Sequence, residues 1–345
     1  MKRILLIVAF AIIVVGGFAA YNIFGPTVKA PKGKYFYIHT GSNYDLVVNN
    51  LIKQNIIPRS TWFNIVSRQL LKYNNIKPGK YEIKKGMSIF NLVRMLRNGR
   101  QTPVNFVIVK YRTKEDFARR VEKDFETDST AMMAFLNNED SLHNYGLDSN
   151  TWMTAIIPNT YSYKWNSTPT VIFSKLYGES KKFWTDERLQ KAQALGLTPR
   201  QVYILASIVE EETSLKSDKG KIASVYINRI KKGMPLQADP TVKFAMKDFG
   251  LKRIWYKHLD YPSPYNTYTN AGLPPGPICT PSVETIDEVL NSPQTDYYYF
   301  VANSDFSGSH IFTSSYEEHK KYAKLFAEAQ NKQDSIRRAK QNSNP

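Results

Sequence analysis

The feature that most constrains this chain is an apolar stretch near its beginning. Lys2 and Arg3 are followed by Ile4 to Phe24, which carry no charge and are almost wholly apolar. A helix needs about 20 such residues to span a bilayer. The alternative is a cleavable signal sequence, but the apolar core of a signal sequence is only about 7–15 residues long. We therefore expect an uncleaved membrane anchor at residues 4–24.

The charges around the anchor predict its orientation. Basic residues next to a membrane span favour the cytoplasmic side, which places Lys2 and Arg3 in the cytoplasm. No second apolar run of this length follows in the sequence. We expect a single-pass protein of the inner (cytoplasmic) membrane, with the rest of the chain in the periplasm or otherwise outside the cytoplasm.

The composition narrows the classes of partner. The formal net charge of +17 indicates an anionic partner, and nucleic acid, phospholipid head groups and cell-wall carboxylates all qualify. We expect no nucleic-acid binding, because the sequence has no zinc finger, helix-turn-helix or phosphate-binding loop. The five histidines and the single Cys279 have no metal-ligand spacing, so we expect neither a metal nor a cofactor.

The pattern along the chain predicts an α+β protein of four parts. Residues 1–28 form a cytoplasmic tip and a transmembrane helix. Residues 29–103 alternate strand and helix patterns and form a small α+β domain beside the membrane. Residues 104–330 form a larger mixed α+β domain that carries the candidate site. Residues 331–345 are polar and basic, and we expect them to be disordered.

A well-signalled helix in the larger domain ends in three consecutive glutamates. Thr198 can cap this helix, Pro199 suits its first turn, and Gln201 completes the spacing of a capping box. At about 100° per residue, Glu212 falls on the apolar face of the helix. Glu210 points nearly the opposite way, and Glu211 lies at the edge.

A carboxyl group on a buried face suggests either chemistry or an ion pair. Burial without a partner raises the pKa of a carboxyl group, which keeps a general acid protonated near neutral pH. The alternative is a structural Glu212 paired with Arg229 or another basic residue. Periodicity alone leaves both interpretations open.

Further polar residues gather after this helix, mostly in a long Pro-rich loop region. Functional side chains often lie in loops held by a rigid frame. The candidates for substrate contacts are Asn228, Arg229, Gln237, Asp239, Tyr265, Asn266, Tyr268 and His310.

Five segments together carry a family resemblance. They are Ala206-Ser-Ile-Val-Glu-Glu-Glu-Thr213, Ala223-Ser-Val-Tyr-Ile-Asn-Arg229, Leu236-Gln-Ala-Asp-Pro-Thr-Val242, Tyr265-Asn-Thr-Tyr268 and Gly272-Leu-Pro-Pro-Gly276. With them the chain resembles the MltG (YceG-like) family of membrane-anchored endolytic murein transglycosylases over roughly residues 30–328. The resemblance implies that the glutamate before Thr213, Glu212, is catalytic. The segment Tyr81–Val93 is similar to a LysM wall-binding module, so we describe residues 29–103 as LysM-like.

The resemblance implies cleavage of the bond between N-acetylmuramic acid and N-acetylglucosamine in peptidoglycan, leaving 1,6-anhydro ends. Glu212 would act first as general acid and then as base, without a cofactor. Cell-wall synthases are expected partners by family analogy only. Two alternatives stay open: a muramidase that hydrolyses the same bond, and a non-catalytic wall-binding scaffold.

Two residues bear on the choice between transglycosylation and hydrolysis. Asn266 cannot act as a base for water, so its presence in the loop region favours transglycosylation. Asp239 is the remaining acid that could activate water. Its structural alternative is to cap the chain before Pro240.

Overall fold

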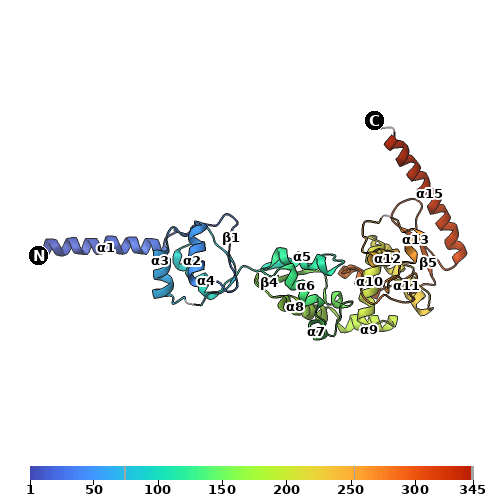
Figure 1. Ribbon diagram of the computed structural model, residues 1–345, viewed down its shortest axis with the longest axis horizontal. Helices are drawn as coiled ribbons and strands as arrows, with labels where there is room; N and C mark the ends of the chain where they lie inside the picture. The colour runs from blue at the N-terminus through green and yellow to red at the C-terminus, as the bar shows by residue number, and fades with distance from the viewer. Residues whose placement is uncertain (74, 252, 343–345) are drawn as a thin grey trace. The chain divides into compact units, whose positions relative to one another are not determined.

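The computed structural model describes residues 1–73, 75–251 and 253–342, and its contacts divide them into two compact units (Figure 1). The first unit consists of Met1–Phe106, Arg119–Ser129 and Thr160–Pro169, and the second consists of Val107–Ala118, Thr130–Asn159 and the described residues from Thr170 onward. The first unit therefore reaches beyond the expected boundary at residue 103. Local sequence pattern does not reveal this, because the two later segments join the first unit through long-range contacts.

The first unit begins with the apolar helix α1 and continues as a small α+β body. Its further elements are β1 (Tyr35–Ile38), α2 (Tyr44–Lys53), α3 (Ser60–Asn64), the π-helix η1 (Ile65–Leu70), β2 (Gly79–Glu82) and α4 (Ile89–Asn98). Strands β1 and β2 pair antiparallel, with Tyr35 opposite Glu82. Helix α1 (Lys2–Phe24) is long and apolar enough to cross a membrane. A buried cluster that includes Phe36, Leu51 and Leu92 forms the core of this unit.

The second unit is mainly helical. Two short strands, β3 (Val104–Val107) and β4 (Thr160–Tyr163), pair with each other, and β4 and all of β3 except Val107 belong to the first unit. The helices from there onward are α5 (Lys114–Asp124), α6 (Ser129–Asn137), α7 (Glu139–His143), the 3-10 helix η2 (Trp152–Ala155), α8 (Pro169–Phe183), α9 (Asp186–Leu195), α10 (Pro199–Glu212), α11 (Lys216–Lys231), α12 (Asp239–Met246), α13 (Tyr256–Leu259), α14 (Val283–Leu290) and α15 (Tyr316–Asn342).

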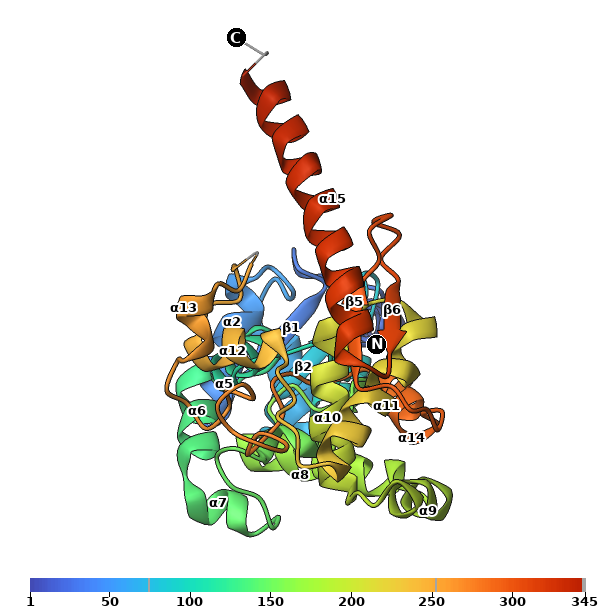
Figure 2. The same ribbon diagram turned by 90° about the vertical axis from the view of Figure 1, so that its right-hand side faces the viewer.

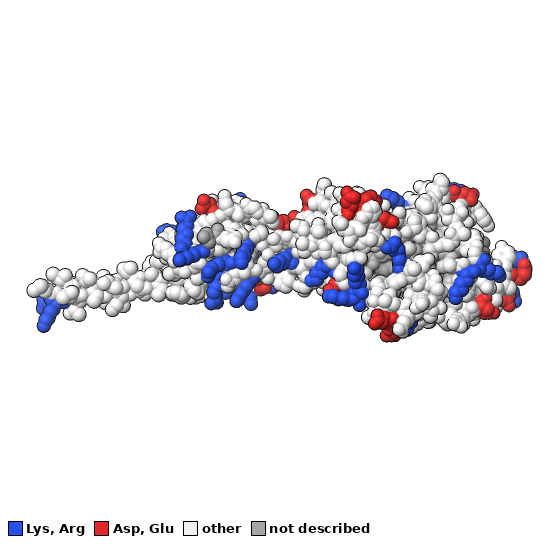
Figure 3. All heavy atoms as spheres, turned by 90° about the horizontal axis from the view of Figure 1, so that it is seen from below, with Lys and Arg blue, Asp and Glu red and all other residues white. Residues whose placement is uncertain are grey.

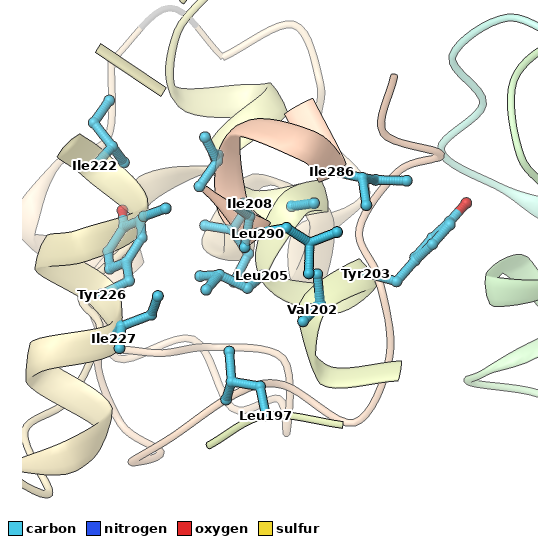
Figure 4. Packing of buried hydrophobic residues seen from close by; sticks show 14 of the residues in the cluster. Leu197, Val202, Tyr203, Leu205, Ile208, Ile222, Tyr226, Ile227, Ile286 and Leu290 are labelled. Carbon is cyan, nitrogen blue, oxygen red and sulfur yellow. The ribbon is translucent and has the colours of Figure 1, made fainter. Parts of the chain in front are cut away.

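Helix α10 is the centre of the second unit. The expected capping box is present: the Thr198 hydroxyl accepts from the Gln201 backbone N–H, and the Gln201 side chain accepts from the Thr198 backbone N–H. Every residue from 202 to 209 is buried, because α11 and α14 pack against α10. Leu205 and Ile208 lie inside the resulting apolar cluster (Figure 4). This packing fixes the direction in which the helix presents its last turn.

The C-terminal part of the unit differs from the prediction. Strands β5 (Tyr299–Ala302) and β6 (His310–Thr313) form an antiparallel hairpin that lies against α15 (Figure 2). Helix α15 continues to Asn342, so the expected disorder of residues 331–345 is wrong for 331–342, and 343–345 lie outside the described residues. A polar composition excludes a packed core but not a helix. Lys, Gln and Arg, which each occur twice in this segment, are all good helix formers.

The capping box of α10 can be tested by substitution. We expect Thr198→Ala to lower the free energy of unfolding of the second unit by about 1 kcal/mol, because it removes the hydroxyl that satisfies a free N–H at the start of the helix. Thermal unfolding of the full chain checks this. Thr198→Ser keeps the hydroxyl and should unfold near the wild-type temperature. An equal loss in both variants would contradict the capping role.

Candidate active site

The three glutamates at the end of α10 have three different environments. Glu210 accepts hydrogen bonds from the hydroxyls of Ser282, at 2.9 Å, and Thr285, and lies 3.6 Å from the Lys219 ammonium. It therefore holds the start of α14 against α10. The structural alternative considered for Glu212, a carboxylate fixed by a basic partner, describes Glu210 instead.

Glu211 is also fixed by ion pairs. Its carboxylate accepts two hydrogen bonds from the Arg112 guanidinium, at 3.2 and 2.8 Å, and lies 3.2 Å from the Lys110 ammonium. Burial alone would raise the pKa of Glu211, but these cations hold it below its usual value. Glu211 is therefore an ionised structural carboxylate at neutral pH.

Glu212 has no ion-pair partner among the described residues. Its Oε1 accepts one hydrogen bond, of 2.6 Å, from the hydroxyl of Tyr226 on α11. Removal of water by the surrounding protein raises the pKa of Glu212 to about 7, and the negative charge of Asp239 contributes in the same direction. The Tyr226 hydrogen bond and the charge of Lys243 act against this rise. Near neutral pH, Glu212 can therefore both give and take a proton.

A second carboxylate belongs to the same neighbourhood. Asp239 is the first residue of α12, and its side chain is exposed. Its Oδ1 accepts a hydrogen bond of 2.6 Å from the Tyr268 hydroxyl. This hydrogen bond adds to burial in raising the pKa of Tyr268 far above its ordinary value. The structure thus brings together Glu212, Tyr226, Asp239 and Tyr268.

Two adjoining hollows lie next to this cluster. One, of about 160 Å³, is lined by Glu211, Lys243 and Ile278 among others. The other, of about 350 Å³, extends past Asn150 and Tyr265. Arg112, Phe244 and Phe249 line both, so we treat the two hollows as one groove, called the α12 groove below. Its aromatic and basic lining suits a polar, anionic ligand that has apolar faces.

Three of the predicted site residues donate their side-chain hydrogen bonds to backbone carbonyls. The Asn228 amide donates to the carbonyls of Thr295 and Tyr297. The Arg229 guanidinium donates to the carbonyls of residues 235, 236 and 298, so it is not the partner of Glu212. Asn266 is fully buried and donates to the carbonyls of residues 259 and 261.

This placement corrects the argument drawn from Asn266. Its side-chain oxygen also accepts from the Tyr268 backbone N–H, so the whole amide is used inside the loop. Asn266 therefore does not distinguish transglycosylation from hydrolysis. Its position next to Tyr268 shows instead that it shapes the loop that presents the Tyr268 hydroxyl to Asp239.

The remaining predicted site residues differ in what surrounds them. Tyr265 lines the α12 groove, packs against Phe244 at 4.7 Å between ring centroids, and donates to Asn150. Gln237 is exposed, with its side-chain oxygen 3.3 Å from the Arg229 guanidinium. His310 is held at 3.0 Å by the buried carboxylate of Asp218.

Sequence reasoning missed two groups that act directly on Glu212. Tyr226 lies in the segment Ala223–Arg229, but that segment was selected for its Asn and Arg. Lys243 stands four residues after Asp239 and therefore on the same side of α12. Both could have been found only by asking which polar residues on neighbouring helices face Glu212. Among the described residues, no three His, Cys, Asp or Glu side chains are placed to hold a metal ion.

Comparison with known proteins identifies the family of the chain. A model of the YceG-like family matches residues 36–325. The chain belongs to the YceG-like family. The crystal structure of a YceG-like protein from Listeria monocytogenes superposes with a TM-score of 0.56 at 25% identity, covering 83% of this chain and 98% of that one.

Two relatives of this YceG-like chain are named endolytic murein transglycosylase. The protein from Bacillus subtilis is 28% identical, and the match covers 92% of each chain. The protein from Streptococcus pneumoniae is 26% identical over 91% of this chain, which spans only 63% of the pneumococcal protein.

The raised pKa of Glu212 has a consequence for stability. A glutamate has a pKa of about 4.5 when exposed and about 7 here, so the folded state holds a proton that the unfolded state releases. Stability is therefore lost as the pH rises through this interval. We expect Glu212→Gln to be more stable than wild type at pH 8 by about 1–3 kcal/mol, with little difference near pH 4. Thermal unfolding at both pH values measures this.

The neighbouring glutamate provides the matched control. The pKa of Glu211 is lowered, so its contribution is present above the unfolded pKa and is lost as the pH falls through the folded pKa. Glu211→Gln should therefore be less stable than wild type at pH 8. A shift of the same sign in both variants would contradict the assignment of Glu212 as the desolvated carboxyl group.

The Tyr226 hydroxyl should tune the acidity of Glu212. It donates to the charged form of the carboxylate, so Tyr226→Phe should raise the pKa of Glu212 above its wild-type value of about 7. Titration of the labelled Glu212 carboxyl carbon by NMR would measure the shift. Tyr268→Phe, which removes the donor to Asp239, serves as the comparison. A lowered pKa of Glu212 in Tyr226→Phe would contradict the hydrogen-bond geometry.

Proposed function

We propose that this chain is an endolytic lytic transglycosylase that cuts peptidoglycan glycan strands with Glu212 as its single acid and base. One observation carries the proposal: of three consecutive glutamates, Glu212 alone has no ion-pair partner among the described residues, and burial raises its pKa to about 7. The relatives' names supply the substrate class, murein.

The proposed reaction uses one carboxyl group twice, first to give a proton and then to take one. Protonated Glu212 donates to the glycosidic oxygen that joins N-acetylmuramic acid to N-acetylglucosamine, and the bond from that oxygen to C1 of the muramic residue breaks. The C6 hydroxyl of the same muramic residue attacks C1, and the Glu212 carboxylate takes its proton. The product ends in a 1,6-anhydro ring. Because the nucleophile belongs to the substrate, the reaction needs no second protein base, and proximity replaces an activated water.

Tyr226 and Lys243 would assist the second half of this cycle. After protonation of the leaving group, Glu212 is a carboxylate in a poorly hydrated position. The Tyr226 hydroxyl hydrogen bond and the positive charge of Lys243 both favour that charged form. The α12 groove, with Tyr265 and Phe244 in its wall, would bind the adjoining sugar and peptide by hydrogen bonds and aromatic stacking. Further candidates for substrate contacts are Gln237, Asp239, Tyr268 and His310.

The first unit would place this activity at a membrane. We propose that α1 is an uncleaved anchor in the inner (cytoplasmic) membrane, with Lys2 in the cytoplasm and the chain after α1 outside it. We further propose a LysM-like role for residues 29–103. A hollow of about 610 Å³ between β1 and α2, lined by Tyr35, Tyr37 and Asn50 among others, supports glycan binding there. Cell-wall synthases remain expected partners by family analogy.

One observation favours hydrolysis as a second candidate. Asp239 is an exposed carboxylate close enough to Glu212 to raise its pKa, and glycosidases that invert or retain use two carboxylates. In a muramidase, Asp239 would activate a water. The released ends would then be reducing muramic residues, heavier by one water than anhydro ends.

Mass spectrometry of released ends tests the proposal. The full chain in detergent is incubated with uncross-linked glycan strands, and the ends are identified. We expect anhydro-muramic ends, and in Glu212→Gln a loss of rate of roughly 10²–10⁴-fold, because the amide cannot donate the proton. Asp239→Asn should keep the anhydro product, since no step depends on that carboxylate.

The controls separate the competing functions. Glu211→Gln changes the adjacent residue without touching the proposed acid and should still release anhydro ends. Reducing ends that disappear in Asp239→Asn would establish the muramidase. Strand binding without any new ends from the wild type would favour the non-catalytic scaffold. Full activity of Glu212→Gln would refute Glu212 as the acid.

A further inference from the structure

Most of the positive charge of the chain lies in the part that follows α1. Residues 25–106 contain 14 Lys and Arg side chains but only two Asp and Glu, a net charge of +12 out of +17 for the whole chain. Lys and Arg side chains accordingly dominate the charged surface of this segment (Figure 3). Such a concentration indicates that the anionic partner of the protein meets the first unit.

Helix α1 is packed against the first unit and is not tethered to it by a free linker. The ring of Phe24 lies 5.3 Å from that of Phe90 on α4, and the ring of Phe18 lies 6.1 Å from that of Trp62 on α3. Ile23 is buried in the core cluster of the unit. The last two turns of α1 are therefore continuous with the body of the unit.

The length of α1 sets the depth of these contacts. From Ile4, a hydrocarbon core of about 30 Å requires about 20 helical residues, which reaches the vicinity of Phe24. Phe18 lies six residues, or about 9 Å, further back along the helix. Trp62, in contact with Phe18, is then level with the lipid of the outer half of the bilayer. Trp is the residue most suited to that interface.

Several exposed cations lie on segments that contact α1 or the chain just after it. Lys29 comes five residues after the end of α1, and Arg94 on α4 lies with its guanidinium 5.8 Å from the centre of the Phe90 ring. Gly86, next to Lys84 and Lys85, donates its backbone N–H to the carbonyl of Val28. Arg59 is the residue before α3. We call the following five residues the basic collar: Lys29, Arg59, Lys84, Lys85 and Arg94.

None of the basic collar residues forms an ion pair within the part of the chain that the structure describes, although Arg94 donates a hydrogen bond of 2.9 Å to Asn91. The two acids of residues 25–106 pair elsewhere, Glu82 with Lys34 at 3.3 Å and Asp45 with Arg68 at 4.0 Å. All five collar side chains are exposed. Cations held at the level of the head groups attract anionic lipids, and each adds to the attraction while it lies within a Debye length of the surface.

We propose that the first unit is seated in the membrane surface and that the basic collar binds the head groups of anionic phospholipids. The proposal rests on α1 being the membrane span proposed above. It differs from a wall-binding role, because the collar cations lie on segments next to α1 and none of them lines the hollow between β1 and α2. The first unit then keeps a fixed height relative to the membrane and does not move on a flexible linker.

A lipid-borne quencher can measure this seating in the full chain. Thr61 is exposed beside Trp62, while Cys279 is fully buried, so a fluorophore attached to Thr61→Cys reports on the first unit alone. The protein is reconstituted in vesicles of phosphatidylcholine, with or without phosphatidylglycerol, that carry nitroxide-labelled lipid. We expect quenching in both, and roughly two-fold more with phosphatidylglycerol at low salt, with the increment lost near 1 M salt.

Charge reversal identifies the groups responsible. The collar variant, in the Thr61→Cys background, carries Arg59→Glu, Lys84→Glu, Lys85→Glu and Arg94→Glu. It should lose the phosphatidylglycerol increment. A matched control reverses four exposed lysines of the second unit and should keep it: Lys231→Glu, Lys257→Glu, Lys321→Glu and Lys332→Glu.

The possible failures are distinguishable. No quenching, or quenching unaffected by phosphatidylglycerol, would overturn the seating. An equal loss in the control variant would show that general charge and not the collar is responsible. Loss of binding to purified sacculi by the collar variant, with its lipid response intact, would assign the collar to the wall polymer and overturn the proposal. Release of the wild type by alkaline carbonate would remove α1 as the span, while strand cleavage in the same samples reports separately on Glu212.

Discussion

The second unit depends on how three adjacent carboxylates at the end of a buried helix are accommodated. Charges this close repel one another, and each needs water, a hydrogen bond or a cation. Glu210 and Glu211 use basic partners from other parts of the chain, Lys219 and Arg112. Glu212 receives only the Tyr226 hydroxyl, so its charge is the one that the fold disfavours.

The same distribution assembles the frame around the site. Because Glu210 binds the start of α14, that helix is fixed against α10. Because Glu211 binds Arg112, the wall of the α12 groove is fixed beside it. Glu210 and Glu211 therefore position the surroundings of Glu212, whose neutral form is left available for proton transfer. The fold therefore disfavours the charged form of Glu212, whereas Glu210 and Glu211 have basic partners. Such a perturbed carboxyl group is common at functional sites.

The local part of this arrangement could be predicted from the sequence, and the long-range part could not. The capping box of α10 and the phase of Glu212 depend only on neighbouring residues, and the structure has both. Arg229 and Asn266 were selected as polar residues near a candidate site, but their partners are backbone carbonyls. In a long loop region, such carbonyls need donors, and periodicity gives no information about them. For the same reason Tyr226, which faces Glu212 from another helix, was missed.

The distribution of charge separates the tasks of the two units. Residues 107–345 carry a net charge of only +3, against +12 for residues 25–106. If positive charge served to attract an anionic glycan strand to the active site, it would be concentrated around the α12 groove. The net positive charge lies instead in residues 25–106, the segment whose aromatic side chains contact α1. In the function and the membrane seating proposed above, charge would therefore act mainly on position, and the local desolvation of one carboxyl group would control the chemistry.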